Sequence, residues 1–398
     1  MDTDQINYIL NRSNSVFHQD FKKYKSDLQS ALTDARVLVI GAAGTIGSAV
    51  CMELVKFDLQ CLHLIDLSEN NLVETVRRIR SSAGFFESEL KTFVIDITSR
   101  YFDQFCASNR SYDYIFNLSA LKHVRSEKDI YSLNRMIDVN IIASMQISKY
   151  AAEIGCQKYF SVSTDKATNP VNMMGASKKI MENILSELSY GVPTSFARFA
   201  NVAFSDGSLL KGFQNRFLLK QPFSAPKDVK RYFISDMEAG KLCILSALLG
   251  KNLDIFFPSE KANLKETSFV DIGERYLEVN GYKAFFYDTD DAARENFKLH
   301  IIKSEWSFYT FVSDTTGEKK LEEFYADTEV LTPINLKDVS AVNLQNKVPE
   351  NYTKNFIKRL GEVRDGSDEN ISNFVKLFEE FLPDFSHAFT GKSLDDKM

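Results

Sequence analysis

Short apolar runs alternate with helix-length amphipathic segments along the chain from residue 35 onward. The apolar runs, rich in β-branched and aromatic residues, occupy 37–40, 61–66, 91–96, 113–120, 158–164 and 193–202. Between them lie the helix-length segments 46–57, 69–82, 138–154 and 173–189. Strands that alternate with helices build βαβ units, in which helices cover both faces of a parallel sheet. The pattern therefore predicts an α/β fold with a doubly wound, Rossmann-type parallel sheet.

The segments around this alternation predict further parts of the molecule. Residues 1–34 are polar, with apolar positions at helical spacing, and predict an N-terminal helical extension that packs on the body or on a second subunit. We expect the sheet domain to cover 35–202, with 234–256 returning to it. We expect a smaller C-terminal α/β substrate-binding domain from 203–233 and 257–330. Residues 331–398 predict a C-terminal helical extension, with amphipathic helices at 351–363 and around 368–381.

Composition narrows the classes of protein and partner. Apolar residues make up 44% and charged residues 26%, and the net charge of −6 provides no field that would attract nucleic acid or an anionic membrane. The five cysteines are scattered without paired spacing, so we expect neither a disulfide framework nor a metal site. The N-terminus lacks a signal-peptide pattern, and no run reaches the roughly 20 apolar residues that span a bilayer. We therefore expect a soluble cytoplasmic protein.

A glycine-rich turn follows the first predicted strand: the sequence VLVIGAAGTIGSAV contains Gly41, Gly44 and Gly47. Glycine is needed where the backbone turns sharply and a pyrophosphate approaches the free amides of a helix N-terminus. Asp66 ends the next strand, 19 residues after Gly47, where a carboxylate can bind the adenosine ribose and repel a 2′-phosphate. Asp96 ends the third strand and is either the neighbour of the adenine or a solvated strand-end carboxylate. These residues predict an NAD site.

The segment after the fifth predicted strand contains the strongest chemical signal. A short-chain reductase has Ser or Thr, then a Tyr about ten residues later, and a Lys four residues beyond the Tyr. Here Thr164 is followed ten residues later by Met174, and Lys178 lies four residues further on. A thioether cannot transfer the proton that the tyrosine would transfer. The adjacent Asp165 and Lys166, which end the strand that faces the cofactor, are the candidates for acid–base work; the alternative is a surface ion pair.

Residues 163–179 have the sequence STDKATNPVNMMGASKK. This stretch resembles the signature of the nucleotide-activated N-acetylhexosamine 4,6-dehydratases, the polysaccharide-biosynthesis branch of the extended short-chain dehydrogenases/reductases. The resemblance continues through GAAGTIG, DLSENNL, NLSALKHV, DVNIIAS, RFANVAFSDGSLLKGF, KRYF and TTGEKKLEEFY, so it spans roughly residues 35–330. Some family members also have Met where Tyr is expected. The chain departs from the family pattern at Ala200 and Ser119, which removes no reactive group. It is most similar to the short, soluble class.

The resemblance implies NAD-dependent 4,6-dehydration of a nucleotide-activated N-acetylhexosamine for bacterial surface glycan synthesis, with UDP-GlcNAc favoured and GDP-GlcNAc as the alternative. Hydride leaves C4 and returns to C6, so NAD would stay bound and be recycled. In this scheme Lys166 is the candidate base at C5, which requires a neutral amine, and burial is expected to lower its pKa. Asp165 is the candidate acid for the 6-hydroxyl. Thr164, or a water relayed through Asp165, would take the 4-hydroxyl proton.

The resemblance also implies which residues bind cofactor and substrate. Lys178 would bind the nicotinamide ribose, and Arg231 would bind the diphosphate through its guanidinium, unless it forms an interdomain ion pair. Asn140 would support the active site. The further cofactor residues are Thr45, Ile46, Ser68, Ile97, Ser119 and Ala120. The further substrate residues are Lys122, His123, Asn201, Ser208, Lys211 and Glu318.

Two other functions fit parts of this pattern. A nucleotide-sugar C4 epimerase would use the same scaffold, but such enzymes depend on the tyrosine and lack the Asp–Lys pair. A catalytically silent NAD-binding sensor or scaffold would tolerate Met174, but it would have no need of Asp165, Lys166 and Lys178 together. We also expect a homo-oligomer, because family members usually pair through helices that resemble 138–154 and 173–189.

Overall fold

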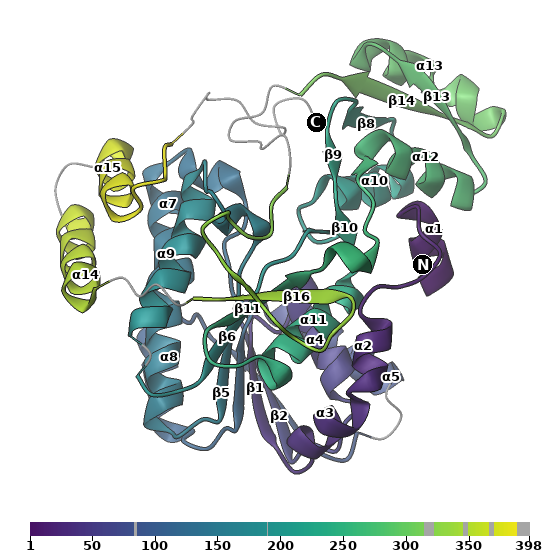
Figure 1. The fold of residues 1–398 in the computed structure, drawn as a ribbon. Coiled ribbons are helices and arrows are strands. Elements are labelled where there is room, and N and C mark those ends of the chain that lie inside the picture. Colours follow the sequence, from purple (N-terminus) through teal and green to yellow (C-terminus); the bar gives the residue numbers. More distant parts are fainter. Residues whose placement is uncertain (83–85, 189, 314–321, 345–348, 366–369, 388–398) are drawn as a thin grey trace.

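A nine-stranded sheet forms the centre of the structure, a computed structural model that describes the chain except residues 83–85, 189, 314–321, 345–348, 366–369 and 388–398 (Figure 1). The strand order is β15-β16-β11-β6-β5-β4-β1-β2-β3. The strands are β1 (Arg36–Ile40), β2 (Cys61–Asp66), β3 (Glu89–Val94), β4 (Tyr114–Asn117), β5 (Lys158–Val162), β6 (Thr194–Ala197), β11 (Asp254–Pro258), β15 (Leu331–Thr332) and β16 (Val339–Asn343). All pairs from β3 to β11 are parallel. The doubly wound α/β fold is therefore confirmed.

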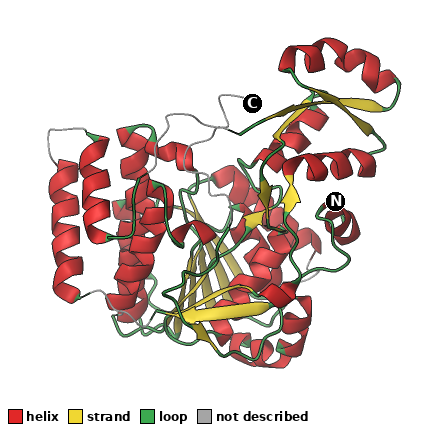
Figure 2. Ribbon diagram, turned by 45° about the horizontal axis from the view of Figure 1, so that its top comes forward, coloured by secondary structure: helices red, strands yellow, loops and turns green. Residues whose placement is uncertain are grey.

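Helices cover both faces of this sheet (Figure 2). Alternate side chains of β1 point to opposite faces, so Val37 and Val39 join one apolar core while Leu38 and Ile40 join the other. The first core is covered by α2 (His18–Lys23), α3 (Lys25–Leu32), α4 (Thr45–Leu54), α5 (Glu69–Ser82) and α11 (Asp236–Leu249). The second is covered by α6 (Arg100–Ser108), α8 (Ala143–Glu153) and α9 (Met173–Glu187). This arrangement brings the carboxyl ends of the strands to one edge.

A smaller lobe lies beyond that edge (Figure 1, upper right). It contains α10 (Leu209–Leu218), β8 (Phe223–Pro226), α12 (Phe269–Val279), β13 (Lys283–Tyr287), α13 (Asp290–Ile302) and β14 (Glu305–Phe311). Its parallel sheet has the order β13-β14-β8, and aromatic rings such as Phe223, Trp306 and Phe308 fill its core. The N-terminal helix α1 (Thr3–Ile9) packs Ile9 into the same core. Residues before the main sheet thus support the smaller lobe.

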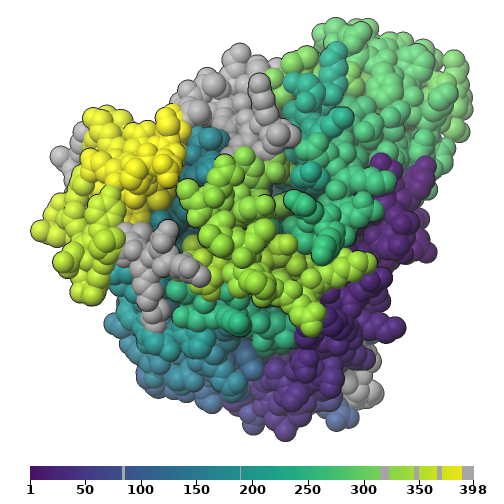
Figure 3. Space-filling view, in the orientation of Figure 1, coloured from purple at the N-terminus to yellow at the C-terminus, as the bar shows by residue number. Residues whose placement is uncertain are grey.

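The segment after residue 330 returns to the main sheet, so the expectation of a purely helical tail is wrong. β16 pairs antiparallel with β11, and β15 pairs antiparallel with β16. Beside them Asp20 accepts hydrogen bonds from the backbone N–H groups of Lys337 and Asp338 (2.8 and 2.7 Å). Figure 3 shows this segment beside the N-terminal residues. Short edge strands carry little periodic signal, because their pairing partner rather than their own pattern decides them.

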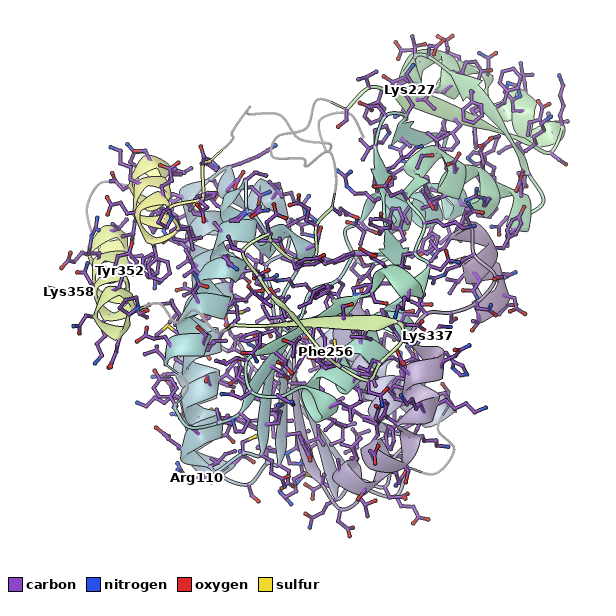
Figure 4. All side chains as sticks on the ribbon, viewed as in Figure 1. Arg110, Lys227, Phe256, Lys337, Tyr352 and Lys358 are labelled. Carbon is purple, nitrogen blue, oxygen red and sulfur yellow. The ribbon has the colours of Figure 1, made fainter. Side chains whose placement is uncertain are left out.

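Two C-terminal helices pack on the outer side of the sheet domain. The helices α14 (Glu350–Asp365) and α15 (Ile371–Phe381) bury Phe356, Phe378 and neighbouring apolar residues against α7 (Ile130–Ile137) and α9. Figure 4 labels Tyr352 and Lys358 on α14, far from the smaller lobe that contains Lys227. The apolar stripe of α9 that faces away from the sheet is therefore covered by the chain itself.

Short elements connect these parts and lie close to the strand ends. They are η1 (Val124–Glu127), the π-helical turn η2 (Asp138–Ile142), η3 (Asp165–Ala167), β7 (Asn201–Val202), β9 (Lys230–Arg231), β10 (Phe233–Ile234), η4 (Glu260–Ala262) and β12 (Thr267–Ser268). β7 pairs with β10, and β9 pairs with β12. These two strand pairs form the junction between the sheet domain and the smaller lobe.

Candidate active site

A cavity of about 540 Å³ lies between the carboxyl ends of the strands and the smaller lobe. Its wall comes from the N-terminus of α4, the loops after β4, β5 and β6, the start of α9, the start of α10, β9 and Glu322. Ligands of doubly wound folds bind at this edge, where the loops that follow neighbouring strands diverge. Thr164, Asp165, Lys166, Met174 and Lys178 all line it.

The glycine-rich turn has the backbone that a pyrophosphate site requires. Gly41 has φ +76°, and a Cβ on it would lie 2.7 Å from the backbone nitrogen of Ser119. A Cβ on Gly47 would lie 2.0 Å from the carbonyl oxygen of Gly41. The Asp66 carboxylate accepts hydrogen bonds from the backbone N–H groups of Ala43 and Ser68, both at 2.9 Å. These residues fit NAD, because the turn stays open at the helix N-terminus and the carboxylate stands at the end of β2.

The predicted cofactor residues divide into two groups. Gly44, Thr45, Ile46, Gly47, Ala120 and Lys178 line the cavity. Gly41, Asp66, Ser68, Asp96, Ile97 and Ser119 lie outside its wall. Asp96 comes two residues after the end of β3 and pairs with Arg135 at 2.9 Å. Burial opposes the effect, but hydrogen bonds from Arg135 and Thr98 lower the pKa of Asp96 below its ordinary value. Asp96 is thus an ionised acceptor anchored to α7.

Thr164, Asp165 and Lys166 form one hydrogen-bonded cluster at the carboxyl end of β5. The Thr164 hydroxyl donates to Oδ1 of Asp165 at 2.8 Å, and Nζ of Lys166 donates to the same oxygen at 3.3 Å. The 3₁₀ turn η3 creates this arrangement, because the Thr164 side chain caps the turn by accepting from the Lys166 backbone N–H. The Asp165 side chain is 5% exposed and that of Lys166 is 34% exposed, so the amine is the member with more access to the cavity.

The expected lowering of the Lys166 pKa is wrong for the ligand-free protein. Burial lowers the pKa of this ammonium, but the carboxylates of Asp165 and Glu322 raise it further than burial lowers it. The net pKa of Lys166 therefore lies above its ordinary value. Two carboxylates near one amine favour the charged form more than a low dielectric disfavours it. Lys166 is an ammonium in the resting site.

Met174 occupies the wall of the cavity on the first turn of α9. It is 3% exposed, and among the residues that the structure describes no tyrosine lines the cavity. Asn172 caps the helix by accepting from the backbone N–H of Gly175 at 2.8 Å. A Cβ on Gly175 would lie 2.3 Å from the carbonyl oxygen of Lys166. Glycine here lets α9 approach η3 closely, which brings Met174 and the Asp–Lys pair to one cavity.

Lys178 lies one helical turn further along α9 and is almost completely buried. Its amine donates to the carbonyl oxygen of Val162, the last residue of β5, at 3.1 Å. Burial lowers the pKa of Lys178 to about 7, although the nearby Glu182 carboxylate opposes this effect. Lys178 can therefore gain or lose its proton near neutral pH.

Asn140 supports the loop after β4 from the π-helical turn η2. Its side-chain amide donates to the carbonyl oxygen of Leu121 (3.1 Å) and to the hydroxyl of Ser177 (2.9 Å). Its side-chain oxygen accepts from the backbone N–H of Leu121 at 3.0 Å. Asn140 thus joins the loop to α9, and it does not line the cavity.

Most of the predicted substrate residues surround the same cavity. Lys122, His123, Asn201, Ser208 and Arg231 line it. Lys211 does not, and its backbone N–H donates to the capping hydroxyl of Ser208. Glu318 lies outside the described residues. For Arg231 the sequence left two alternatives, a diphosphate ligand or an interdomain ion pair. Its position is compatible with both, because Arg231 lines the cavity and its Nε also lies 3.6 Å from the Glu322 carboxylate.

Glu322 is a charged residue of the cavity that sequence reasoning did not single out. Its side chain is 3% exposed and lines the cavity beside Arg231. Burial, together with the Asp165 carboxylate, raises the pKa of Glu322 to about 7, against the opposing charge of Lys166. The signal in the sequence is the segment TTGEKKLEEFY, which resembles the family and contains Glu322, but a pair of acids such as that in LEEFY is by itself typical of a solvated helix or loop.

A family model described as a polysaccharide biosynthesis protein matches residues 37–344. The chain belongs to the polysaccharide biosynthesis protein family. The match covers the main sheet, including β15 and β16, and the smaller lobe. The resemblance seen in the TDK and MGASKK motifs is therefore confirmed at the level of the family.

Relatives of this polysaccharide biosynthesis family member include proteins of different lengths. The chain is 27% identical over 326 residues to an uncharacterized membrane protein of Methanocaldococcus jannaschii, covering 79% of this chain and 88% of the relative. It is 28% identical over 264 residues to the capsular polysaccharide biosynthesis protein CapD of Staphylococcus aureus, covering 63% of this chain. The matched region spans only 42% of CapD.

Solved structures with the same fold include enzymes whose names state an activity on a nucleotide sugar. Pen of Bacillus thuringiensis matches with a TM-score of 0.62 and 21% identity, covering 80% of this chain and 90% of Pen. DesIV of Streptomyces venezuelae, a dTDP-glucose 4,6-dehydratase with NAD bound, matches with a TM-score of 0.52 and 16% identity, covering 70% and 88%. A UDP-N-acetylglucosamine 4-epimerase of Methanobrevibacter ruminantium matches with a TM-score of 0.55 and 18% identity, covering 74% and 91%. At these identities the likeness shows the fold.

Two expected absences concern membranes and metals. Within the described part of the family member, no helix has both the length and the apolar character that crossing a bilayer requires. The same residues contain no group of three or more His, Cys, Asp or Glu side chains arranged to hold a metal ion.

Proposed function

We propose that this member of the polysaccharide biosynthesis family catalyses the NAD-dependent 4,6-dehydration of a nucleotide-activated N-acetylhexosamine, with UDP-GlcNAc as the substrate and GDP-GlcNAc as the alternative. The observation that carries the proposal is the Thr164–Asp165–Lys166 cluster in a cavity where Met174 holds the tyrosine position. Elimination of water needs one acid and one base on neighbouring atoms of the sugar. The cluster supplies both groups, whereas tyrosine-dependent epimerisation lacks its proton carrier.

The Asp165–Lys166 hydrogen bond explains how an ammonium can become the base. The resting pair is a carboxylate and an ammonium, joined at 3.3 Å. Transfer of one proton along this bond gives a neutral amine and a carboxylic acid. The amine then removes the C5 proton, while the acid protonates the 6-hydroxyl that departs as water. One internal proton transfer thus produces both reactive forms. Thr164, which donates to the same Asp165 oxygen, would relay the 4-hydroxyl proton to water. Lys166 would return its proton to C5 as hydride reaches C6 and then take one proton back from water, so that the pair regains its carboxylate and ammonium.

The remaining residues bind and orient. NAD, when bound, accepts hydride from C4 and returns it to C6. Gly41, Gly44 and Gly47 would hold its pyrophosphate, Asp66 its adenosine ribose and Lys178 its nicotinamide ribose. Arg231 and Asn201 would bind the diphosphate of the substrate, since both line the cavity on the side of the smaller lobe.

Incubation of the purified protein with UDP-GlcNAc or GDP-GlcNAc, followed by mass spectrometry and NMR, tests the proposal. We expect a product that has lost one water and contains a 4-keto-6-deoxy sugar. A product of unchanged mass with inverted C4 would establish an epimerase instead. No turnover of either sugar nucleotide, in protein shown to contain NAD, would favour the silent scaffold.

Variants of the cluster give the second arm of this test. Asp165→Asn and Lys166→Ala each should lower kcat by about two orders of magnitude or more, because each removes a proton-transfer group. Glu153→Gln and Lys149→Ala are the matched controls, since these residues form an exposed ion pair on α8. Near-normal rates in the cluster variants would remove Asp165 and Lys166 from the mechanism.

A further inference from the structure

The Glu322 carboxylate lies among hydrogen-bond donors at the junction of the two lobes. Its Oε1 accepts from the side-chain amide of Asn201 and lies 3.6 Å from Nε of Arg231. Its Oε2 accepts from the backbone N–H of Tyr232 at 2.8 Å. A guanidinium, an amide and a backbone N–H are the donors that bind phosphate oxygens in proteins. An acidic side chain thus occupies a set of donors suited to an anion.

The same donors are those assigned to the substrate diphosphate. Asn201 and Arg231 line the cavity, and Glu322 lines it beside them. A diphosphate that reaches Arg231 therefore comes close to a nearly dehydrated carboxylate. Like charges at short range in a low dielectric repel strongly, so the two anions cannot both remain charged without cost.

We propose that Glu322 is a positioning residue of the nucleotide-sugar site, which holds Arg231, Asn201 and the Tyr232 amide in place when the site is empty and takes up a proton when a diphosphate binds. The inference rests on the proposed function, because it assumes that the diphosphate reaches Arg231. It goes further in coupling substrate binding to a proton taken from water.

The charges around Glu322 favour this uptake. Asp165 of η3 repels the carboxylate, and Lys166 of η3 and Arg231 of β9 attract it. Together with burial, these charges raise the pKa of Glu322 to about 7. Protonation of its carboxylate therefore costs little free energy at neutral pH. An added diphosphate raises the pKa of Glu322 further. The affinity should therefore be highest below pH 7 and should fall as the pH rises above 7.

Titration calorimetry with UDP-xylose tests the proposal. This sugar nucleotide has no C6 hydroxyl to lose, and its doubly esterified diphosphate does not titrate near neutral pH. At pH 7.5, in buffers with different ionisation enthalpies, we expect the wild-type protein to take up between about one half and three quarters of a proton per UDP-xylose bound. Its Kd should rise by up to about tenfold for each pH unit above 7.

The Glu322→Gln variant should bind UDP-xylose without proton uptake and with a Kd that is flat between pH 6 and 8.5. Glu323→Gln is the matched control, because Glu323 is exposed and pairs with Asn169, and it should behave as the wild type. Equal proton uptake in the wild type and Glu322→Gln overturns the inference but leaves the proposed function intact. If Glu322→Gln does not fold, a flat pH profile of the wild-type Kd overturns it. Failure of UDP-xylose to bind at all overturns the inference but leaves the proposed function intact, because UDP-xylose lacks the N-acetyl group of the proposed substrate.

Discussion

Lys178 shows how a single residue can serve the site at the expense of the fold. Its amine is buried between α9 and β5, and burial lowers its pKa to about 7. In the unfolded chain the same lysine titrates near its ordinary value of 10.5. Between these two values the unfolded state binds more protons than the folded state. The free energy of unfolding therefore increases as the pH rises from 7 to 10.5, and it is lowest below pH 7.

Lys178→Met should raise the free energy of unfolding by roughly 1–3 kcal/mol at pH 7, because it removes a buried amine and retains its volume. The gain should shrink as the pH rises towards 10. Urea unfolding followed by circular dichroism measures both effects, with the exposed Lys149→Met as the control. Lower stability of Lys178→Met at pH 7 would mean that the hydrogen bond to Val162 outweighs the burial of the amine. The variant should be inactive in either case.

Lys166 shows where reasoning from sequence fails at the scale of a residue. Its neighbours in the chain predict a desolvated amine at a strand end, and this prediction is sound as far as burial goes. The rise of its pKa, however, comes from the adjacent Asp165 together with Glu322, a residue 156 positions later in the sequence. No local sequence pattern predicts that Glu322 lies near Lys166. Motif spacing identifies candidate reactive groups, but the charge state of each group is a property of the folded surroundings.

At the scale of elements, a buried ion-pair network joins α9 and the end of β6 to the segment that contains Glu322 and Glu329. Arg198 follows β6 and is fully buried. Its guanidinium contacts Glu182 of α9 at 2.6 Å and Glu329 at 2.7 Å. Burial opposes the effect, but hydrogen bonds from Arg198 lower the pKa of Glu329 to about 2. The Ser163 hydroxyl also donates to Glu182, at 2.6 Å, so the network reaches the residue next to Thr164.

Arg198→Met should destabilise the protein by about 3–5 kcal/mol, because it leaves Glu182 buried without its guanidinium partner. The exposed pair of Arg77 and Glu74 provides the control: Arg77→Met should change the free energy of unfolding by less than about 1 kcal/mol. Urea unfolding at pH 7 measures both variants. A loss below 1 kcal/mol in Arg198→Met would show that water or a rearranged lysine replaces the guanidinium.

Helices and strands could be predicted where a regular pattern of hydrophobic residues matches the side of the element that is buried. The six strands from β1 to β6 and the helices α4, α5 and α9 lie within a few residues of their predicted ranges. Strand ends shift because hydrogen-bond partners, rather than composition, terminate them: β3 stops at Val94 although the apolar run continues to Ile95. β15 and β16 were missed because only their contact with β11 distinguishes them from loop.

At the scale of the whole molecule, α14 and α15 change what can be expected of assembly. The predicted homo-oligomer would pair through helices resembling 138–154 and 173–189. The outward stripe of α9 instead packs Ile180 and Ile184 against Phe378 and other residues of α14 and α15. A partner subunit that uses this stripe would first have to displace the chain's own helices.

Phe378→Asp should release α15 from α9, because a buried carboxylate without a partner costs more than about 3 kcal/mol. Limited proteolysis should then cleave the chain between β16 and α15 faster, and light scattering should detect association through the exposed stripe. Lys358→Asp is the matched control, because its side chain is 77% exposed. Figure 4 labels this residue on α14. Unchanged cleavage and mass in Phe378→Asp would contradict the covering role of α15.

The return of residues 322–343 to the sheet domain has a consequence for protein synthesis. These residues are translated after the whole smaller lobe, yet they provide Glu322 to the cavity, Glu329 to Arg198 and β16 to the edge of β11. A growing chain that ends before them has the glycine turn and the Asp–Lys pair, but its sheet edge is unpaired and Arg198 lacks one carboxylate. The segment that completes the site is therefore synthesised after the rest of the site. A chain released before this segment would expose the unpaired edge of β11, which favours aggregation.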